Sequence, residues 1–125
     1  MILHYKNQVW LEQRPQSGIW GGLYCFPEHT NHELSHLLDQ RMIQAKDIVK
    51  QQTLISFRHT FSHYHLDITP ILVELSKQPN MVMEGTNSLW YNLSQPDEVG
   101  LAAPVKLLLE SLPYELQSSL KKESL

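Results

Sequence analysis

The chain has 125 residues, of which 42% are hydrophobic, so it has the length and apolar content of one domain with one buried core. Its formal net charge of −3 argues against a protein that holds nucleic acid by charge alone, because Lys and Arg contacts to phosphates supply most non-specific affinity. A single cysteine, Cys25, excludes an internal disulfide framework and a multi-cysteine metal site in this segment. No apolar run approaches the roughly 18 residues of a membrane span, so we expect a soluble protein of the reducing cytoplasm.

The first half of the chain predicts a hairpin, a tight loop and a helix, in that order. Residues 2–13 are rich in apolar and aromatic residues and are interrupted at 6–8 by a polar trio suited to a turn. Residues 14–27 combine turn formers, three aromatics and two adjacent glycines, which favours a tight loop across a core. Thr30 and Glu33 match a capping box, and the leucines that follow predict a short helix to about Arg41 with its apolar face on a sheet. These leucines are Leu34, Leu37 and Leu38.

The second half predicts another hairpin, a short strand and a second helix. Residues 52–75 are rich in β-branched and aromatic residues, and a polar cluster at 58–65 divides them into two arms with an elaborate tip. Residues 89–91 predict a short strand. Residues 101–112 predict a helix with Pro104 in its first turn and an apolar face. That face comprises Val105, Leu108, Leu109 and Leu112. We therefore expect an α+β fold, a mixed sheet flanked by helices, as a single domain over 1–113 with a flexible polar tail over 114–125.

Four segments, in this order, resemble the C-terminal domain of bacterial A/G-specific adenine DNA glycosylases, the MutY family. They are Glu12-Gln13-Arg14-Pro15 with Gly18-Ile19-Trp20-Gly21-Gly22-Leu23-Tyr24-Cys25-Phe26-Pro27, then Phe57-Arg58-His59-Thr60-Phe61-Ser62-His63, then Leu89-Trp90-Tyr91, and finally Gly100-Leu101-Ala102-Ala103-Pro104-Val105. Together they run through most of the chain. The resemblance implies a Nudix-like (MutT-like) fold and a role in reading damaged guanine in DNA.

A Nudix hydrolase would also need the Nudix box, G-x5-E-x7-R-E-U-x-E-E-x-G-U, whose glutamates hold a divalent metal. Aligning Gly22 with the first glycine places Glu28 correctly. The later positions depart from the box, with His36 in place of the arginine and other residues in place of the glutamates. Those residues are Leu37, Gln40 and Arg41. We therefore expect no catalytic residue and no metal in this segment, and a binding role instead.

The resemblance assigns lesion reading to Phe61, Ser62 and His63 at the hairpin tip. Ordinary guanine presents N7 as an acceptor, whereas 8-oxoguanine carries a hydrogen on N7 and an oxygen on C8. The Ser62 hydroxyl can accept from N7–H while its backbone N–H donates to O8. Phe61 would act as an apolar wedge against the base steps, and His63 would orient the loop or contact a phosphate. Arg58 and Thr60 lie beside this tip and complete the expected DNA-binding set.

Other polar residues support weaker hypotheses. Arg14 and Lys106 are candidates for phosphate contacts, although scattered surface cations usually serve solvation. His59, His63 and His65 would share one face of a strand, which raises a zinc hypothesis that lacks a fourth ligand. Trp20 and Trp90 are expected to be core anchors, and Gly21 and Gly22 to permit either a tight turn or the close approach of a partner.

In the family, a separate N-terminal domain with a 4Fe-4S cluster flips and removes adenine opposite 8-oxoguanine. The resemblance thus implies, for this segment, no cofactor of its own, duplex DNA with A:8-oxoguanine or A:G mispairs and that catalytic domain as partners, a monomer, no membrane, and work at the nucleoid. Met1 directly precedes strand-like sequence, so we expect the natural chain to begin upstream. Two alternatives stay open: a stand-alone hydrolase of oxidised nucleotides using Glu28 and Glu33, and a protein-interaction domain using the C-terminal helix.

Overall fold

The computed structural model describes residues 1–29, 34–61, 63–78, 87–96 and 98–112. The backbone forms a mixed sheet with the order β3-β2-β1-β7-β4, and β8 pairs with β2 outside this path. The strands are β1 (Ile2–Tyr5), β2 (Gln8–Gln13), β3 (Tyr24–Cys25), β4 (Ile48–Thr53), β7 (Ile71–Leu75) and β8 (Ser88–Asn92). β1 and β7 run parallel, and the other pairs are antiparallel. The expected α+β fold with a mixed sheet is confirmed.

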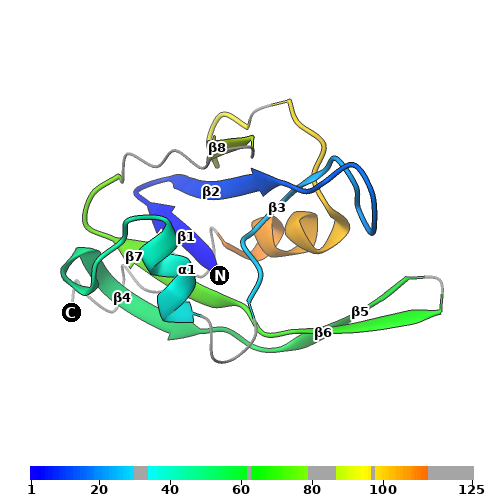
Figure 1. Ribbon diagram of the computed structural model, residues 1–125, viewed down its shortest axis with the longest axis horizontal. Helices are drawn as coiled ribbons and strands as arrows, with labels where there is room; N and C mark the ends of the chain where they lie inside the picture. Colours follow the sequence, from blue (N-terminus) through cyan, green and yellow to red (C-terminus); the bar gives the residue numbers. More distant parts are fainter. Residues whose placement is uncertain (30–33, 62, 79–86, 97, 113–125) are drawn as a thin grey trace.

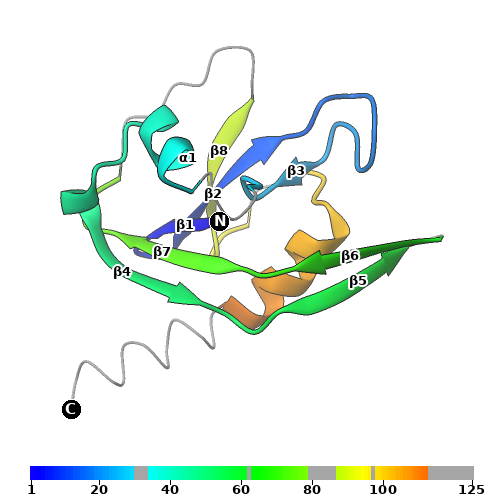
Figure 2. The ribbon, with the colours of Figure 1, turned by 60° about the horizontal axis from the view of Figure 1, so that its bottom comes forward.

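Each face of the sheet carries its own apolar core, because successive side chains of a strand point to opposite faces. Ile2 and Val9 belong to the first cluster, whereas their neighbours Leu3 and Trp10 belong to the second. The first cluster packs against the helix at 103–112, and the second against α1 (Leu34–Gln40). Figures 1 and 2 show the sheet between these two helices. A short 3-10 helix, η1 (Ala45–Asp47), leads into β4.

The predicted helices are confirmed with small shifts of their ends. α1 ends at Gln40, and its leucines contact the core as expected, with Leu38 buried and Leu34 and Leu37 half-buried. The second helix starts at residue 103 rather than 101, which places Pro104 in its first turn. Among the described residues, no helix is long and apolar enough to cross a membrane. The expected capping box at 30–33 and the expected tail at 114–125 lie outside the described residues.

The second hairpin differs from its prediction. Its outer strands, β4 and β7, belong to the main sheet. The chain between them forms a separate two-stranded sheet, β5 (Phe57–Phe61) with β6 (Tyr64–Ile68). The polar cluster at 58–65 is therefore mostly paired strand rather than an elaborate tip. A backbone hydrogen bond from the Leu54 N–H to the Pro70 carbonyl (2.9 Å) lies at the junction between the main sheet and the two-stranded sheet. In both ribbon views the β5–β6 ribbon projects away from the body (Figures 1 and 2).

Candidate nucleic-acid interface

The register of the β5–β6 ribbon gives it two different faces. Arg58 pairs with Asp67 and Thr60 with His65, so these four residues share one face, which we call the polar face. Phe57 pairs with Ile68 and His59 with Leu66 on the opposite, apolar face. Two adjacent antiparallel strands have the width that the major groove of duplex DNA admits. The ribbon is therefore narrow enough for the major groove and presents one polar and one apolar face.

The polar face carries an exposed ion pair. Arg58 donates from Nε to Asp67 Oδ1 (2.8 Å), and the two side chains remain 60% and 71% exposed. The hydrogen bond and the charge of Arg58 hold the pKa of Asp67 below its usual value. Thr60 Oγ1 and His65 Nδ1 lie 3.0 Å apart on the same face. Because exposed pairs contribute little stability, the Arg58 guanidinium can change partner to a phosphate at low cost.

The tip of the ribbon is short. Phe61 closes β5 by pairing with Tyr64, and His63 lies exposed in the turn between the strands. The side chain of Phe61 and the whole of Ser62 lie outside the described residues. The structure thus places the backbone of Phe61 and His63 at the far end of the projecting ribbon, and the contacts of the predicted reading residues to a base stay a prediction.

The prediction that His59, His63 and His65 share one face is wrong. The chain reverses between β5 and β6, so His59 stands opposite Leu66 on the apolar face while His65 stands opposite Thr60 on the polar face. His63 is not part of either strand. Within the described residues there is no group of three His, Cys, Asp or Glu side chains that could hold a metal ion. The geometry thus separates two of the histidines that the zinc hypothesis needed together.

The glycine-rich loop at 14–22 is wound tightly beside the ribbon. A Cβ atom added to Gly21 would lie 2.2 Å from the carbonyl oxygen of Gln16, and Gly22 has a φ of 77°. The tight turn alone therefore accounts for both glycines. Trp20 also has a positive φ, 53°, which is a strained conformation for a bulky residue and costs on the order of 1 to 3 kcal/mol. The side chain of Arg14 reaches across this loop to the Ile19 carbonyl.

Arg14 is engaged within the protein. Its Nε donates to the Ile19 carbonyl (2.9 Å), its Nη1 pairs with Glu28, and its guanidinium lies 5.9 Å from the centre of the Trp20 ring. Lys106 is exposed on the helix at 103–112. Of the two predicted phosphate contacts, Arg14 would have to exchange these partners first, whereas Lys106 lies in solvent.

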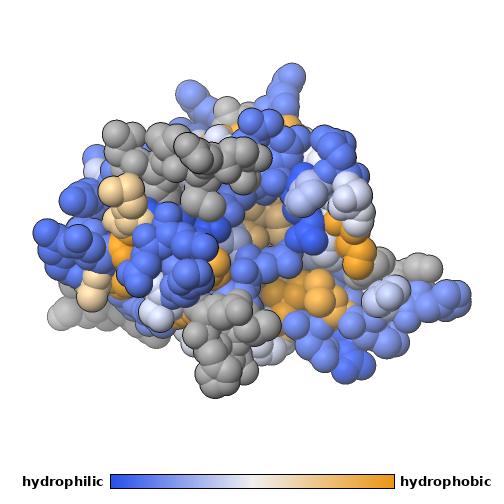
Figure 3. Space-filling model, viewed as in Figure 1, coloured by the Kyte–Doolittle hydropathy of each residue, from blue (hydrophilic) through white to orange (hydrophobic). Residues whose placement is uncertain are grey.

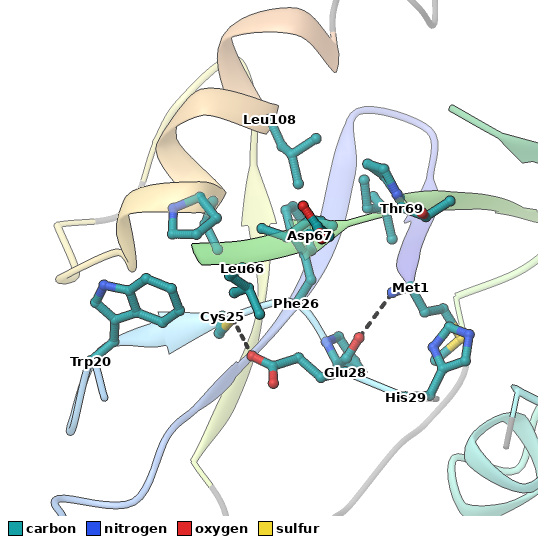
Figure 4. Close-up of a pocket in the computed structure, with 16 residues that line it drawn as sticks. Met1, Trp20, Cys25, Phe26, Glu28, His29, Leu66, Asp67, Thr69 and Leu108 are labelled. Carbon is teal, nitrogen blue, oxygen red and sulfur yellow. Dashed lines mark hydrogen bonds between the residues drawn. The ribbon is translucent and has the colours of Figure 1, made fainter. Parts of the chain in front are cut away.

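A pocket of about 210 Å³ lies where the ribbon meets the body (Figure 4). Leu66 lines it from the ribbon, Leu108 from the second helix, and Trp20 from the glycine-rich loop. Cys25 and Glu28 lie on the remaining side, with the thiol donating to Glu28 Oε1 (3.4 Å). Burial, together with Glu28, raises the pKa of the Cys25 thiol to about 11, so it stays protonated and unreactive. Figure 3 shows an apolar surface at this junction.

Arg41, which stands at one of the Nudix-box glutamate positions, forms an internal ion pair with Glu12 of β2. Arg41, 5% exposed, donates from Nε and Nη2 to the two carboxylate oxygens of Glu12, at 2.7 Å each, and from Nη1 to the Leu37 carbonyl (3.0 Å). The indole of Trp10 donates to the same carboxylate (2.7 Å). A buried guanidinium repels a divalent cation, and Glu28 is bound to Arg14, so the described residues do not fit the metal that the fold's hydrolases hold. Glu33 lies outside the described residues.

Sequence comparison assigns the fold to a known family. The family model described as "NUDIX domain" matches residues 1–111. The chain belongs to the NUDIX domain family. A protein named adenine DNA glycosylase from Buchnera aphidicola subsp. Acyrthosiphon pisum (strain APS) is 36% identical over 112 residues, which is 89% of this chain and 31% of that protein. A protein of the same name from Buchnera aphidicola subsp. Schizaphis graminum (strain Sg) is 35% identical over 111 residues, which is 88% of this chain and 31% of that protein. This NUDIX chain thus spans 31% of the length of these relatives.

The motifs that carried the resemblance lie together in this NUDIX domain. Tyr24 of the loop motif donates its N–H to the Gly100 carbonyl (2.8 Å) and accepts from Ala102 N (3.0 Å). Trp90 packs against Trp10 with ring centres 5.3 Å apart, which confirms it as a core anchor. Trp20 is also half-buried against the core, and it contacts the ribbon as well, since its ring centre lies 5.8 Å from that of His59. No pattern in the sequence predicts this last contact or the Glu12–Arg41 pair.

Proposed function

We propose that this chain is the lesion-reading domain of an adenine DNA glycosylase that acts in base excision repair. The observation that carries the proposal is the projecting β5–β6 ribbon, which ends in Phe61, Ser62 and His63 on a domain similar to the adenine DNA glycosylases of Buchnera. Once the adenine has been flipped out of the stack, the ribbon reaches the oxidised guanine from the major groove, where N7 and C8 of a guanine can face a reader. Ser62 accepts from N7–H and donates its backbone N–H to O8.

Neither the ribbon nor the whole chain carries a net positive charge, which is consistent with a reading domain that has little affinity for DNA by itself. On the polar face Asp67 offsets Arg58, and the chain as a whole carries a net charge of −3. A reading domain tethered to a catalytic domain works at high effective concentration and gains selectivity without a strong grip. We propose that the rest of the protein supplies the base flipping, the bond cleavage and the 4Fe-4S cluster, and that the whole acts as a monomer on nucleoid DNA in the cytoplasm.

Substitutions at the tip of the ribbon test the proposal in the full-length enzyme. Ser62→Ala is expected to weaken the preference for A:8-oxoguanine over A:G by about 1 kcal/mol, roughly fivefold, because one neutral hydrogen bond is lost and the backbone donor remains. Replacing Phe61 and His63 as well is expected to reduce the preference further. The measurement is single-turnover adenine release from the two mispairs under identical conditions.

Leu107→Ala is the matched control, since Leu107 is exposed on the second helix, away from the ribbon tip, and its truncation is expected to leave the ratio unchanged. Equal loss of activity on the two mispairs in the triple variant would contradict the lesion-reading role.

The alternative of a nucleotide hydrolase has less support. It relied on Glu28 and Glu33, and Glu28 is paired with Arg14 while it accepts from Cys25. Incubation of the chain with Mg²⁺ and 8-oxo-dGTP decides between the two functions: release of pyrophosphate would favour the hydrolase over a reading domain.

A further inference from the structure

The orientation of the β5–β6 ribbon depends on few contacts. The ribbon forms its own two-stranded sheet and joins the main sheet only through the short segments 54–56 and 69–70. At this junction Leu54 N bonds to Pro70 O, and the hydroxyls of Ser56 and Thr69 lie 2.7 Å apart. A two-stranded ribbon is by itself only marginally rigid. Its angle to the body must therefore be set by whatever it touches beyond the junction.

The body does not support the ribbon with a continuous core. The pocket of about 210 Å³ lies beneath it, between Leu66 and Ile68 on the ribbon and Val105 and Leu108 on the second helix (Figure 4). Side chains that border a space of this size lack packing partners on one side. A contact at the edge of the pocket therefore contributes more to the angle of the ribbon than it would above a filled core.

Trp20 makes such a contact. Its indole lies against the ring of His59 with centres 5.8 Å apart and planes tilted by 53°, a favourable geometry for two aromatic rings. His59 lies on the apolar face of the ribbon, between the junction and the tip. The contact is thus placed where it can resist a swing of the ribbon.

The glycine-rich loop holds Trp20 firmly in this position. The backbone of Trp20 has a φ of 53°, and its carbonyl accepts from Leu23 N (3.0 Å). Arg14 packs its guanidinium over the indole and binds the preceding carbonyl of Ile19 (2.9 Å). Strained backbone persists only where its surroundings enforce it, and here those surroundings direct a large ring toward the ribbon.

We propose that Trp20 is a positioning residue that fixes the angle of the β5–β6 ribbon through its contact with His59, so that the tip meets the damaged base. The proposal deepens the proposed function and rests on it for the role of the tip. From the junction to the tip is about six residues, or roughly 20 Å at about 3.3 Å per residue. A swing of roughly 10° would therefore displace the tip by about 3.5 Å, which is longer than a hydrogen bond.

The first test measures ribbon orientation without DNA. In the ¹⁵N-labelled chain, residual dipolar couplings of the β5 and β6 amides are expected to fit one alignment tensor together with those of the main sheet. In Trp20→Leu they are expected to need a separate tensor or to be averaged, whereas Trp20→Phe, which keeps a ring, restores the single fit. Ile19→Ala is the control, because Ile19 is the exposed neighbour of Trp20 in the same loop.

A second variant guards against loss of the fold in Trp20→Leu. His59→Ala removes the same contact from the ribbon side and leaves the glycine-rich loop intact, so it is expected to free the ribbon in the same way. Unchanged couplings in both variants, or a Trp20→Phe chain that behaves like Trp20→Leu, would overturn the proposal.

The second measurement tests whether the position of the ribbon affects recognition of the damaged base. The ratio of affinities for duplexes with A:8-oxoguanine and with A:G is expected to fall at least threefold in Trp20→Leu and to recover in Trp20→Phe. An altered ribbon orientation with an unaltered ratio would overturn the link to recognition. A wild-type chain that shows no preference between the duplexes would instead count against the proposed function, while the couplings still decide whether Trp20 positions the ribbon.

Discussion

Glu12→Leu is expected to lower the free energy of unfolding by about 3 to 5 kcal/mol, the loss typical of removing one partner of a buried ion pair. The carboxylate accepts two bonds from Arg41 and one from the Trp10 indole, so its removal leaves the buried Arg41 cation without its counter-ion and the Trp10 N–H without its acceptor. Denaturant unfolding at neutral pH, followed by tryptophan fluorescence, measures the change.

The double variant Glu12→Leu with Arg41→Met is the control for this prediction. Replacing both members of a buried pair by apolar residues is often neutral or stabilising, so most of the lost stability is expected to return. A single Glu12→Leu variant that loses less than about 1 kcal/mol would show that the pair is solvated in solution and does not close this face of the sheet.

The ion pair involves a position that belongs to the metal site in the Nudix hydrolases. Arg41 stands where the Nudix box has a metal-binding glutamate, and it fastens the end of α1 to β2 through Glu12.

Stability is expected to decrease on acidification because of His4, by up to about 3 kcal/mol between pH 6.5 and pH 4. His4 lies in β1, 5% exposed, and burial lowers its pKa from 6.5 to about 4. Within this pH range the unfolded chain binds a proton at His4 that the folded chain does not bind. The unfolded state therefore gains stability as the pH falls, and the folded state loses it in comparison.

His4→Leu isolates this contribution, because it removes the titrating group and leaves every carboxylate in place. The free energy of unfolding of the wild type, measured relative to that of His4→Leu from pH 7.5 to pH 4, is expected to fall by up to about 3 kcal/mol as the pH falls. Curves that stay parallel over this range would contradict the buried, neutral His4.

Local patterns in the sequence predicted most of the individual elements. The first hairpin, the leucine face of α1 and the position of Pro104 follow from alternation, from helical spacing and from the missing N–H of proline, and all three need only neighbours in the sequence. The loss of the Nudix glutamates was visible in the same way. The tip residues of the ribbon were found through the family resemblance and not through the physics of the hairpin.

Contacts between residues far apart in the sequence could not be predicted from these local patterns. The break between the main sheet and the ribbon depends on which partner each arm finds, and residues 52–75 read as continuous strand sequence on both sides. The turn decides which histidines face each other, and a shift of one residue in the pairing moves a side chain to the other face. The pairing of Glu12 with Arg41 joins residues 29 positions apart, and that of Trp20 with His59 joins the glycine-rich loop to strand β5.

Titration of the ¹⁵N-labelled chain with a duplex that contains one A:8-oxoguanine pair, and with the same duplex carrying A:G, tests the central claim most directly. Amide shifts are expected to change along residues 57–68, most strongly at 61–63, and more with the oxidised duplex than with A:G. Equal changes with the two duplexes, or silence at 61–63 while the helix at 103–112 responds, would contradict a lesion-reading ribbon and favour a protein-interaction domain.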